Sequence, residues 1–491
     1  MTQSDSHFPI LITGDTLEAW LAAVYLARVL TRTPLEVAIL PVEYSGEISG
    51  AIVALPEVVD FHAALGFDER DLLRFCGGCF RLGALYEDWS AAGSRAVHAY
   101  GASPPSPGEG AFHQYWNRVR GEADVEPYSA YSLAASMAAT DRFNHPGEVE
   151  AAEGHYRYGY HFNAARYREY LKRAALHYGA RLIEPGMDRI HLSDDNGSLA
   201  GLQLADGRTV TADTYVDASG FGLLAGALAG SDWQHDRILP FNAQYTVEQP
   251  PGVLSRSRIV AQADSLLIET PTVHSQYRSL VFESGKFSRA EAAARLGPGG
   301  TYSEFHRGYR QPWRANCLAL GPSAFHLGPL EGVSLQLIMT GVLRLAELFP
   351  GKGAEAIAAA EYNRRMMMTY HRLRDLQGMH YALSGQPWAV PEEKLSAENR
   401  IRLEQFRSRG RVVTFDDETF SPDSWTSIML GHGVHPRRVD PLATVLPVGE
   451  LRQRLRSLRE HVRKTCESLP TQRVYLEQAN AIAPIGERSP A

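Results

Sequence analysis

The sequence predicts an α/β fold whose C-terminal region is mostly helical. Three observations carry this prediction. The stretch ILITGDTLEAWLAAVYLARVL, from Ile10 to Leu30, has the outline of a buried strand, a tight turn and a helix. Strand patterns recur through the first two thirds of the chain, as far as Leu318–Gly321, and helical patterns rich in Arg and Glu follow Ala354. Strands first and helices last favour an α/β nucleotide-binding core joined to a helical region.

The elements between these ends follow from periodicity and turn residues. Apolar positions at helical spacing predict helices, and Gly or Pro marks where they end. Alternating patterns on either side of Asp206-Gly207 predict two strands about a tight turn, and a strand is expected to end at Asp217. The remaining expected elements are helical sequence over Pro56–Phe75, one strand over Phe80–Tyr86, a surface loop over Gly101–Ala111, and helices over Ala164–Tyr178 and Val333–Leu348.

Composition limits the classes of function. Of the 491 residues, 44% are hydrophobic and 21% are charged, and the formal net charge is −7. A mildly acidic balance without clustered Lys and Arg argues against a nucleic-acid partner or an anionic membrane surface. We find no apolar run of membrane-spanning length and no signal-peptide pattern in the opening MTQSDSHFPI. With four cysteines in the whole chain, we expect a cytoplasmic protein with free thiols.

The first turn departs from the Rossmann fingerprint. Three glycines normally allow the tight turn, the approach of a pyrophosphate and the packing of helix on strand. Those three slots hold Thr13, Asp15 and Glu18 in this chain, and Gly14 fills a variable slot. The two carboxylates suit the positive end of the helix dipole, but they place like charge where an anionic ligand would bind.

The second strand also lacks an expected residue. An acid that binds a ribose should follow LEVAIL (Leu35–Leu40), but Pro41 stands there and Glu43 comes two residues late. These residues leave two alternatives open, a dinucleotide site or a packed βαβ unit without a ligand.

The pair CGGC, Cys76 to Cys79, is the one cysteine motif. It follows a helical stretch and precedes a strand, which is not the position of a thioredoxin-like pair. Cys317 and Cys466 are isolated, so a second pair of zinc ligands is missing and we expect no metal site. Small residues packing a helix-to-strand turn are the favoured interpretation, and His161 is expected to be packed or hydrogen-bonded rather than a base.

Five segments in the same order resemble the flavin-dependent tryptophan halogenases, a branch of the FAD monooxygenase-like fold. The resemblance covers nearly the whole chain. The segments are GFDERDLLRFCGGCFRLGALYEDW (Gly66–Trp89), YGYHFNAARYREYL (Tyr158–Leu171), VDASGF (Val216–Phe221), NCLALGPSAFHLGPLEGVSLQLIMTGVLRLAELFP (Asn316–Pro350) and SWTSIMLGHGVHPRRVDPLA (Ser424–Ala443).

The resemblance implies an FAD/NAD(P)-binding Rossmann-like core of the flavin monooxygenase and halogenase type. This core would cover residues 1–350, with inserted substrate-side segments at about 90–160 and 225–312, and a helical region would cover 351–491. Reduced FAD from a separate reductase would react with O₂ and halide, and the oxidant would reach a lysine and a glutamate beside an aromatic, usually indole-like, substrate. The residues that match the FAD-contacting segments are Gly14, Thr16, Asp217, Gly220 and Gly321.

The matching catalytic positions are Arg81 and Glu331. Arg81 takes the place of the lysine because the family's FKLG-like segment reads FRLG, and a guanidinium stays charged and is a poor nucleophile. Glu331, in GPLEGVS, retains the glutamate; the alternative is an acid that stabilises the following helix. The family's WxWxIP segment is best placed at SLLIETPTVH, in which Pro271 alone is kept.

Three functions from different classes remain. The first is a flavin-dependent oxidoreductase that halogenates or hydroxylates an aromatic substrate, with weakened FAD binding. The second is a non-catalytic paralogue that binds FAD weakly or not at all and serves as a binding or partner subunit. The third, flavin-independent chemistry, has no nucleophile–base pair to support it. The expected partners are a small aromatic substrate and a flavin reductase, and a homodimer is left open.

Overall fold

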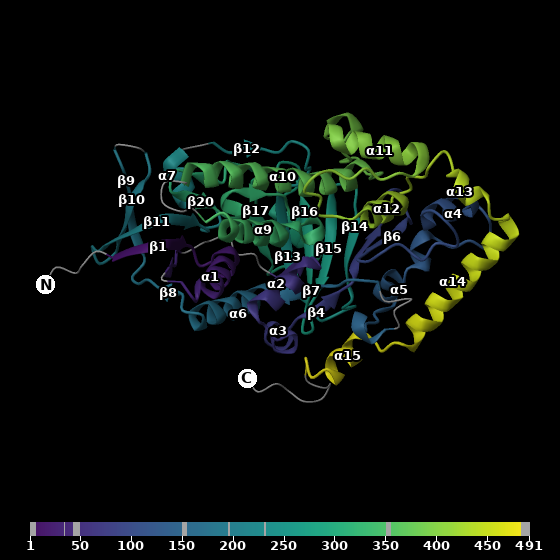
Figure 1. The fold of residues 1–491 in the computed structure, drawn as a ribbon, viewed down its shortest axis with the longest axis horizontal. Helices are drawn as coiled ribbons and strands as arrows, with labels where there is room; N and C mark the ends of the chain where they lie inside the picture. Colours follow the sequence, from purple (N-terminus) through teal and green to yellow (C-terminus); the bar gives the residue numbers. More distant parts are fainter. Residues whose placement is uncertain are drawn as a thin grey trace.

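The computed structural model describes residues 6–33, 35–42, 50–149, 155–194, 197–229, 232–349 and 355–482. Glu43, the late acid after the second strand, lies outside these residues. Figure 1 shows an elongated molecule with one sheet at one end, a second sheet in the middle, and helices α4, α13 and α14 at the far end. The helical character of the C-terminal region is confirmed.

The first sheet is built around strand β1. Neighbours run parallel to it on both sides, β11 on one and β2 on the other, and β20 is parallel to β11. The strand order is β19-β20-β11-β1-β2-β8; in addition, β10 pairs antiparallel with β11, and β9 pairs antiparallel with β10. The bounds are β1 Ser6–Thr13, β2 Val37–Leu40, β8 Arg181–Leu182, β9 Met187–Leu192, β10 Leu199–Leu204, β11 Thr209–Asp217, β19 Trp313–Arg314 and β20 Cys317–Ala319.

The predicted strand, turn and helix at the start of the chain are confirmed. Helix α1 spans Leu17–Leu30, and Thr16 caps it by accepting a hydrogen bond from the backbone N–H of Ala19. The helix is buried on nearly all sides because it packs between β1, α6 (Ala164–His177) and α9 (Val333–Glu347). Its many Ala and Leu residues suit that position, since they favour a helix and leave no polar group without a partner.

The second sheet carries the residues of the middle of the chain. Its order is β17-β13-β16-β15-β14-β5-β6, and every neighbouring pair is antiparallel except β14 with β5. The bounds are β5 Gly83–Glu87, β6 Arg95–Ala99, β13 Ala243–Gln249, β14 Arg256–Ala261, β15 Ser265–Pro271, β16 Gln276–Phe282 and β17 Thr301–Glu304. The stretch that ends at Pro271 is therefore a central strand of this sheet.

The prediction of one strand over Phe80–Tyr86 is wrong, because the chain changes sheets at Leu82. Strand β4 (Cys79–Arg81) belongs to the small sheet β3-β7-β4, whereas β5 begins at Gly83 in the second sheet. The backbone N–H of Leu82 bonds to the carbonyl of Ser255, and a Cβ added at Gly83 would stand 2.1 Å from the carbonyl oxygen of His98. This close approach of two strands requires glycine and places Arg81 at the junction of two sheets.

Two small sheets and the remaining helices complete the described residues. Among the described residues, no further strand pairs with the far side of β4; there the side-chain amide of Gln472 in α15 bonds to both the N–H and the carbonyl of Phe80. The remaining strands are β3 Ala51–Ala54, β7 Gly159–Asn163, β12 Gln234–His235, β18 Gly308–Tyr309 and β21 Phe325–His326. The remaining helices are α2 Glu57–Leu65, α3 Glu69–Cys76, α4 Phe112–Val119, α5 Leu133–Thr140, α7 Leu223–Ala229, α8 Arg289–Leu296, α10 Glu355–Ala382, α11 Ala397–Arg409, α12 Pro422–Gly431, α13 Pro441–Thr444, α14 Val448–Ser468 and α15 Gln472–Gln478.

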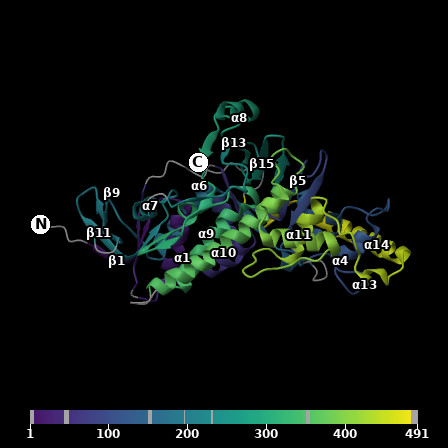
Figure 2. The ribbon, with the colours of Figure 1, turned by 90° about the horizontal axis from the view of Figure 1, so that it is seen from above.

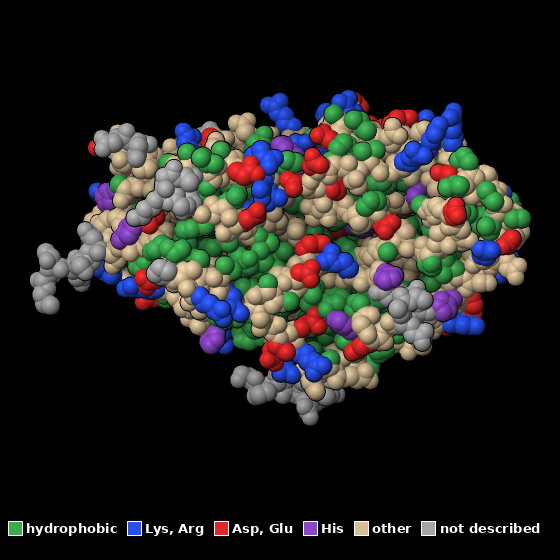
Figure 3. Space-filling view, viewed as in Figure 1, with side chains coloured by type: hydrophobic (Ala, Val, Ile, Leu, Met, Phe, Trp, Pro, Cys, Tyr) green, Lys and Arg blue, Asp and Glu red, His purple; other side chains and the backbone are tan. Residues whose placement is uncertain are grey.

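Helix α10 links the two halves of the molecule. It lies alongside α9 in Figure 2 and runs from the first sheet toward the helices of the C-terminal region. In the space-filling view, cationic and anionic side chains are interspersed over the visible face rather than separated by sign (Figure 3). Among the described residues, every helix is too short or too polar to cross a membrane.

Candidate functional site

Arg81 and Glu331 meet in the interior of the protein although 250 residues separate them in the sequence. Arg81 ends β4, and Glu331 lies in the short turn Leu330–Gly332 that precedes α9. Nη2 of Arg81 stands 3.2 Å from Oε2 of Glu331, and both side chains are excluded from solvent. The structure therefore brings together the two residues that the sequence predicted as catalytic.

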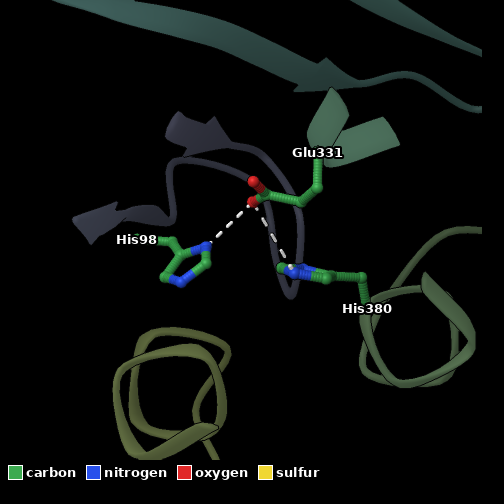
Figure 4. Close-up of side chains that lie close together, drawn as sticks. All are labelled: His98, Glu331 and His380. Carbon is green, nitrogen blue, oxygen red and sulfur yellow. Dashed lines mark hydrogen bonds and ion pairs between the residues drawn. The ribbon is translucent and has the colours of Figure 1, made fainter. Parts of the chain in front are cut away.

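The backbone at Glu331 explains where its side chain points. Glu331 has φ +63° and ψ 0°, a left-handed conformation that L-residues adopt at a cost of roughly 1–3 kcal/mol. A Cβ at the next residue, Gly332, would stand 2.6 Å from Cγ1 of Val53, so the turn is pressed against β3. Glu331 thus lies outside the first turn of α9, and Figure 4 shows its carboxylate turned toward His98 and His380.

Four groups surround the carboxylate of Glu331. Besides Arg81, the hydroxyl of Tyr86 on β5 donates to Oε1 over 2.5 Å, and Nδ1 of His98 on β6 stands 3.0 Å from the same oxygen. Nε2 of His380, from α10, lies 3.8 Å away (Figure 4). Five elements thus converge on one buried anion, which is the arrangement that satisfies a desolvated carboxylate.

Burial and pairing decide the protonation of these groups. Burial raises the pKa of Glu331, but the neighbouring His98 and Arg81 outweigh burial and hold that pKa well below its usual range. Burial lowers the pKa of His380 to about 3 and raises the pKa of Tyr86 well above its usual value. At neutral pH the centre is therefore an ionised Glu331–Arg81 pair beside a neutral imidazole and a neutral phenol.

Arg81 makes further contacts on its other side. Its Nε donates to the hydroxyl of Ser257, which also lies 2.9 Å from Nε2 of His161, and its guanidinium stacks on the ring of Tyr100 at 5.1 Å. Nη1 of Arg81 is buried and has no hydrogen-bond partner among the described residues. His161 is hydrogen-bonded within the core, as the sequence indicated.

The cysteines are buried thiols. Cys76 ends α3 and Cys79 begins β4, and burial raises the pKa of both thiols. Sγ of Cys79 contacts Nδ1 of His161 at 3.7 Å. A buried neutral thiol is a packing group rather than a nucleophile, because the thiolate is the reactive form.

One group of side chains has the composition of a metal site. Ligand atoms of His98, Glu331 and His380 all lie within 4.8 Å of one another (Figure 4). We assign no metal to them, because the cation of Arg81 and the hydroxyl of Tyr86 already occupy the two oxygens of the same carboxylate. A divalent cation there would face a fixed positive charge in a dry environment.

The residues predicted to bind FAD gather at one edge of the first sheet. Gly14 and Thr16 follow β1, Asp217 ends β11 and is followed by Gly220, and Gly321 follows β20. The hydroxyl of Thr16 donates to the carbonyl of Ala218, and a Cβ at Gly14 would stand 2.2 Å from that carbonyl oxygen. The carboxyl ends of parallel strands are where an open α/β sheet binds its ligands.

Both carboxylate oxygens of Asp217 accept hydrogen bonds from neighbouring residues of the chain. One carboxylate oxygen accepts from the backbone N–H groups of Leu224 and Ala225, and the other accepts from the N–H and the hydroxyl of Ser219. Asp217 therefore holds the start of α7 against the end of β11 and shapes the turn that contains Gly220.

The first turn of α1 fits a pyrophosphate poorly. Glu18 is 2% exposed, and burial raises its pKa to about 7, against the lowering effect of its own backbone N–H and the Thr16 hydroxyl. A Cβ at Gly321 would stand 3.2 Å from Cβ and Cγ of Glu18, so the side chain fills the space beside the third glycine turn. The turn after β1 therefore presents a buried acid at the start of α1, the end of the helix where a dinucleotide site needs free N–H groups for its phosphates.

Asp15 has partners that the sequence did not reveal. Its Oδ1 accepts from the indole N–H of Trp20 over 2.6 Å, and its backbone carbonyl accepts from Nη1 of Arg168 in α6 over 2.9 Å. The guanidinium of Arg168 thus brings a positive charge to the same turn, which offsets part of the carboxylate field.

Sequence reasoning missed most of the groups around Glu331. Tyr86 lies within the segment GALYEDW, which carried the family resemblance, and its place in that segment was the available signal. His98 and His380 lie in no quoted segment, and each meets Glu331 through tertiary structure alone. Arg168 falls in YGYHFNAARYREYL, with no feature that indicates the turn it contacts.

The architecture is similar to that of solved flavin-dependent halogenases. A flavin-dependent halogenase from Brevundimonas sp. BAL3, BrvH, superposes with a TM-score of 0.89 and 27% identity, covering 97% of this chain and 99% of that one. A flavin-dependent halogenase from Xanthomonas campestris also gives a TM-score of 0.89, at 25% identity over 99% and 100% of the two chains. The fold is that of the flavin-dependent halogenases.

The family follows from the sequence match. Tryptophan 7-halogenase RebH of Lentzea aerocolonigenes is 22% identical to this chain, and the alignment covers 96% of this chain and 98% of RebH. The tryptophan halogenase family model matches residues 9–448. The chain therefore belongs to the tryptophan halogenase family as a divergent member, and the predicted resemblance and fold class are confirmed.

Proposed function

We propose that the protein is a flavin-dependent oxidoreductase that halogenates or hydroxylates a small aromatic, indole-like substrate. Reduced FAD, supplied by a separate reductase, would provide the electrons that activate O₂. Within the chain, Glu331 would hold or accept a proton and Arg81 would offer its unpartnered Nη1 to a polar or anionic group. Arg81 cannot act as a lysine nucleophile, because the guanidinium stays protonated.

The observation that carries the proposal is the convergence of Arg81 and Glu331. Their Nη2 and Oε2 atoms lie 3.2 Å apart in a solvent-free centre, within a chain that matches flavin-dependent halogenases from end to end. A buried ion pair contributes little to stability by itself, since desolvation offsets most of the attraction. A functional reason for keeping the two charges there is therefore favoured.

The buried Glu18 supports a second candidate function, a non-catalytic paralogue that binds FAD weakly and acts as a partner subunit. The Cβ and Cγ atoms of Glu18 pack against Gly321, and the residue lies in the first turn of α1, the end of the helix that a pyrophosphate would approach. The two candidates differ in one measurable property, which is turnover in the presence of a saturating concentration of reduced FAD.

The test is a reaction of the purified protein with a flavin reductase, NADH, FAD and O₂, with and without bromide or chloride. Tryptophan, indole and phenolic compounds serve as substrates, and mass spectrometry identifies the products. A Glu331→Gln variant and a reaction without the protein are the controls for oxidation by free peroxide.

We expect any enzyme-dependent product to be hydroxylated, with little chlorination of tryptophan, because Arg81 offers no titratable amine to direct the oxidant. Halogenated product at enzyme-dependent rates would refute the hydroxylation and show that Arg81 supports halogenation. Equal product with and without the protein, at saturating FAD, would refute the oxidoreductase and support the partner-subunit function.

A further inference from the structure

A chain of hydrogen bonds leads away from the buried carboxylate of Glu331. Tyr86 donates to Oε1 over 2.5 Å, and the Tyr86 oxygen lies 3.5 Å from Nε2 of His380. Nδ1 of His380 lies 2.8 Å from Nε2 of His432, the residue that follows α12. The four side chains belong to residues that are 5% exposed or less, so bulk solvent does not reach Glu331 directly.

The order of donors along this chain follows from its first contact. Tyr86 gives its only proton to Glu331, which is ionised, so a hydrogen bond across its 3.5 Å contact with His380 requires Nε2–H of His380 as the donor. His380 is neutral and carries one ring proton, so its Nδ1 accepts from Nε2–H of His432. His432 then keeps a lone pair on Nδ1, which is buried and has no partner among the described residues.

An open cleft of about 490 Å³ lies at the other end of the chain. Its wall includes residues 382–385 at the end of α10, residues 432–435 after α12, and the ion pair of Arg407 with Glu392. His432 is the one member of the hydrogen-bonded chain that lines this cleft. Water held in the cleft beside Nδ1 would supply the partner that His432 lacks.

We propose that His380 and His432 transfer protons between the cleft and Glu331. They act on the reaction through Glu331 and do not touch the substrate themselves. This inference deepens the proposed function, because a buried acid–base group needs a path for the proton it exchanges. A proton from water binds Nδ1 of His432, and Nε2–H of His432 passes to Nδ1 of His380. Nε2–H of His380 then passes to the Tyr86 oxygen, and the Tyr86 proton passes to Oε1 of Glu331.

The number of protons is conserved in this transfer, and both imidazoles are neutral before and after it. One proton leaves the water, one arrives at Glu331, and both histidines change from the Nε2–H to the Nδ1–H tautomer. Return of a proton in the opposite direction restores the first state. The groups that face this path are Arg81 and His98 at Glu331, and the ring of Trp89, which stacks on His432 at 5.6 Å. The charge of Arg81 keeps Glu331 ionised at rest, so the path is used only when chemistry at the centre demands a proton.

The first test needs no turnover. In protein labelled with ¹⁵N-histidine, NMR should show His380 and His432 as Nε2–H tautomers, and the exchange of the His380 ring proton with water is then measured. We expect His432→Phe, which keeps a ring stacked on Trp89, to slow this exchange at least about tenfold. The matched control is His113→Phe, a buried histidine that bonds to the carbonyl of Gly410 and is not a member of the hydrogen-bonded chain.

A second variant guards against misfolding. His432→Gln can still donate an amide N–H to His380 but cannot relay a proton, and it should also slow the exchange. Exchange at the wild-type rate in a folded His432→Phe or His432→Gln protein would overturn the proposal, as would an Nδ1–H tautomer of His380 at rest.

The second test uses the oxidation reaction. His432→Gly should lower turnover and make it more dependent on pH, and added imidazole, which the cleft can admit, should restore it; added imidazole should not restore His113→Phe. Lost turnover without rescue would count against the relay. If the wild-type protein shows no turnover, the proposed function fails, and the exchange measurement alone decides the relay.

Discussion

The side chain of Glu18 packs directly against Gly321, where an added Cβ would stand 3.2 Å from the Cβ of Glu18. Two turns of the first sheet therefore meet through one buried acid. Because this acid lies in the first turn of α1, where the sequence predicts the phosphate group, we expect its ionisation to affect both the stability of the fold and the binding of an anionic cofactor.

The pH dependence of stability should change when Glu18 is replaced by glutamine. The folded-state pKa of Glu18 is raised from 4.5 to about 7, so its favourable contribution is complete below pH 4.5 and is lost as the pH rises through 7. The free energy of unfolding of the wild type should fall relative to Glu18→Gln by up to about 3 kcal/mol over this window. Urea denaturation at pH 5 and pH 8 measures the difference, and parallel pH profiles would contradict it.

FAD affinity should rise when the acids of the first turn are removed. We expect weak binding by the wild type at pH 8 and a gain of about 1 kcal/mol for each charge removed in Asp15→Gly and Glu18→Gly. Glu169→Gln, which removes an exposed acid from α6, is the matched control and should leave the affinity unchanged. Calorimetry that gives sub-micromolar binding of FAD to the unmodified protein would refute this prediction.

Breaking the central ion pair should destabilise the fold strongly. Arg81→Met leaves the carboxylate of Glu331 buried without its cation, at a cost of roughly 3–5 kcal/mol. The double variant Arg81→Met with Glu331→Leu should recover much of that loss, because no unpaired charge remains. Denaturant unfolding of the single and double variants tests this, and an additive loss in the double variant would show that the charges do not act as a pair.

Arg81→Lys is a separate test of chemistry. It restores an amine at the position where the family has lysine, yet we expect no efficient halogenation, because Asp15 and Glu18 still oppose FAD. Mass spectrometry of the tryptophan and indole reactions with bromide is the measurement. Efficient halogenation by this single variant would show that the first turn tolerates the cofactor.

Gly14→Ala should disrupt the start of the first sheet. Gly14 has φ +137°, and an added Cβ would stand 2.2 Å from the carbonyl oxygen of Ala218. We expect a loss of at least about 3 kcal/mol from the combined strain and overlap. Gly179→Ala, at φ +96° with open space around it, separates the two effects because it carries the strain without the overlap. Similar losses in the two variants, measured by thermal unfolding, would assign the effect to backbone strain alone.

The parts of the fold that the sequence predicted correctly are set by local patterns. The strand, turn and helix at Ile10–Leu30 carry their own cap in Thr16, and the turn at Asp206-Gly207 joins β10 to β11 as expected. The prediction of one strand over Phe80–Tyr86 was wrong because the chain changes sheets at Leu82. That change depends on a hydrogen bond to Ser255, a residue far along the chain.

The centre around Glu331 could be predicted only in part. Family resemblance indicated Arg81 and Glu331, but a sequence does not show that their charges neutralise each other in a closed interior. His98 is 233 residues from Glu331, and His380 is 52 residues from His432. A histidine in a sequence can be a base, a metal ligand or a packed core residue. The folded chain is therefore needed to show that His98, His380 and His432 belong to one centre.

The bond between Gln472 and Phe80 has a consequence for the behaviour of the whole protein. Strand β4 is an edge strand, and the side-chain amide of Gln472 occupies the N–H and carbonyl of Phe80 on its outer side. An edge with free backbone groups is a template on which another chain can add a strand. The last described helix thus shields the segment that carries Arg81 from self-association, and a chain cut before Gln472 would be prone to aggregate through that edge.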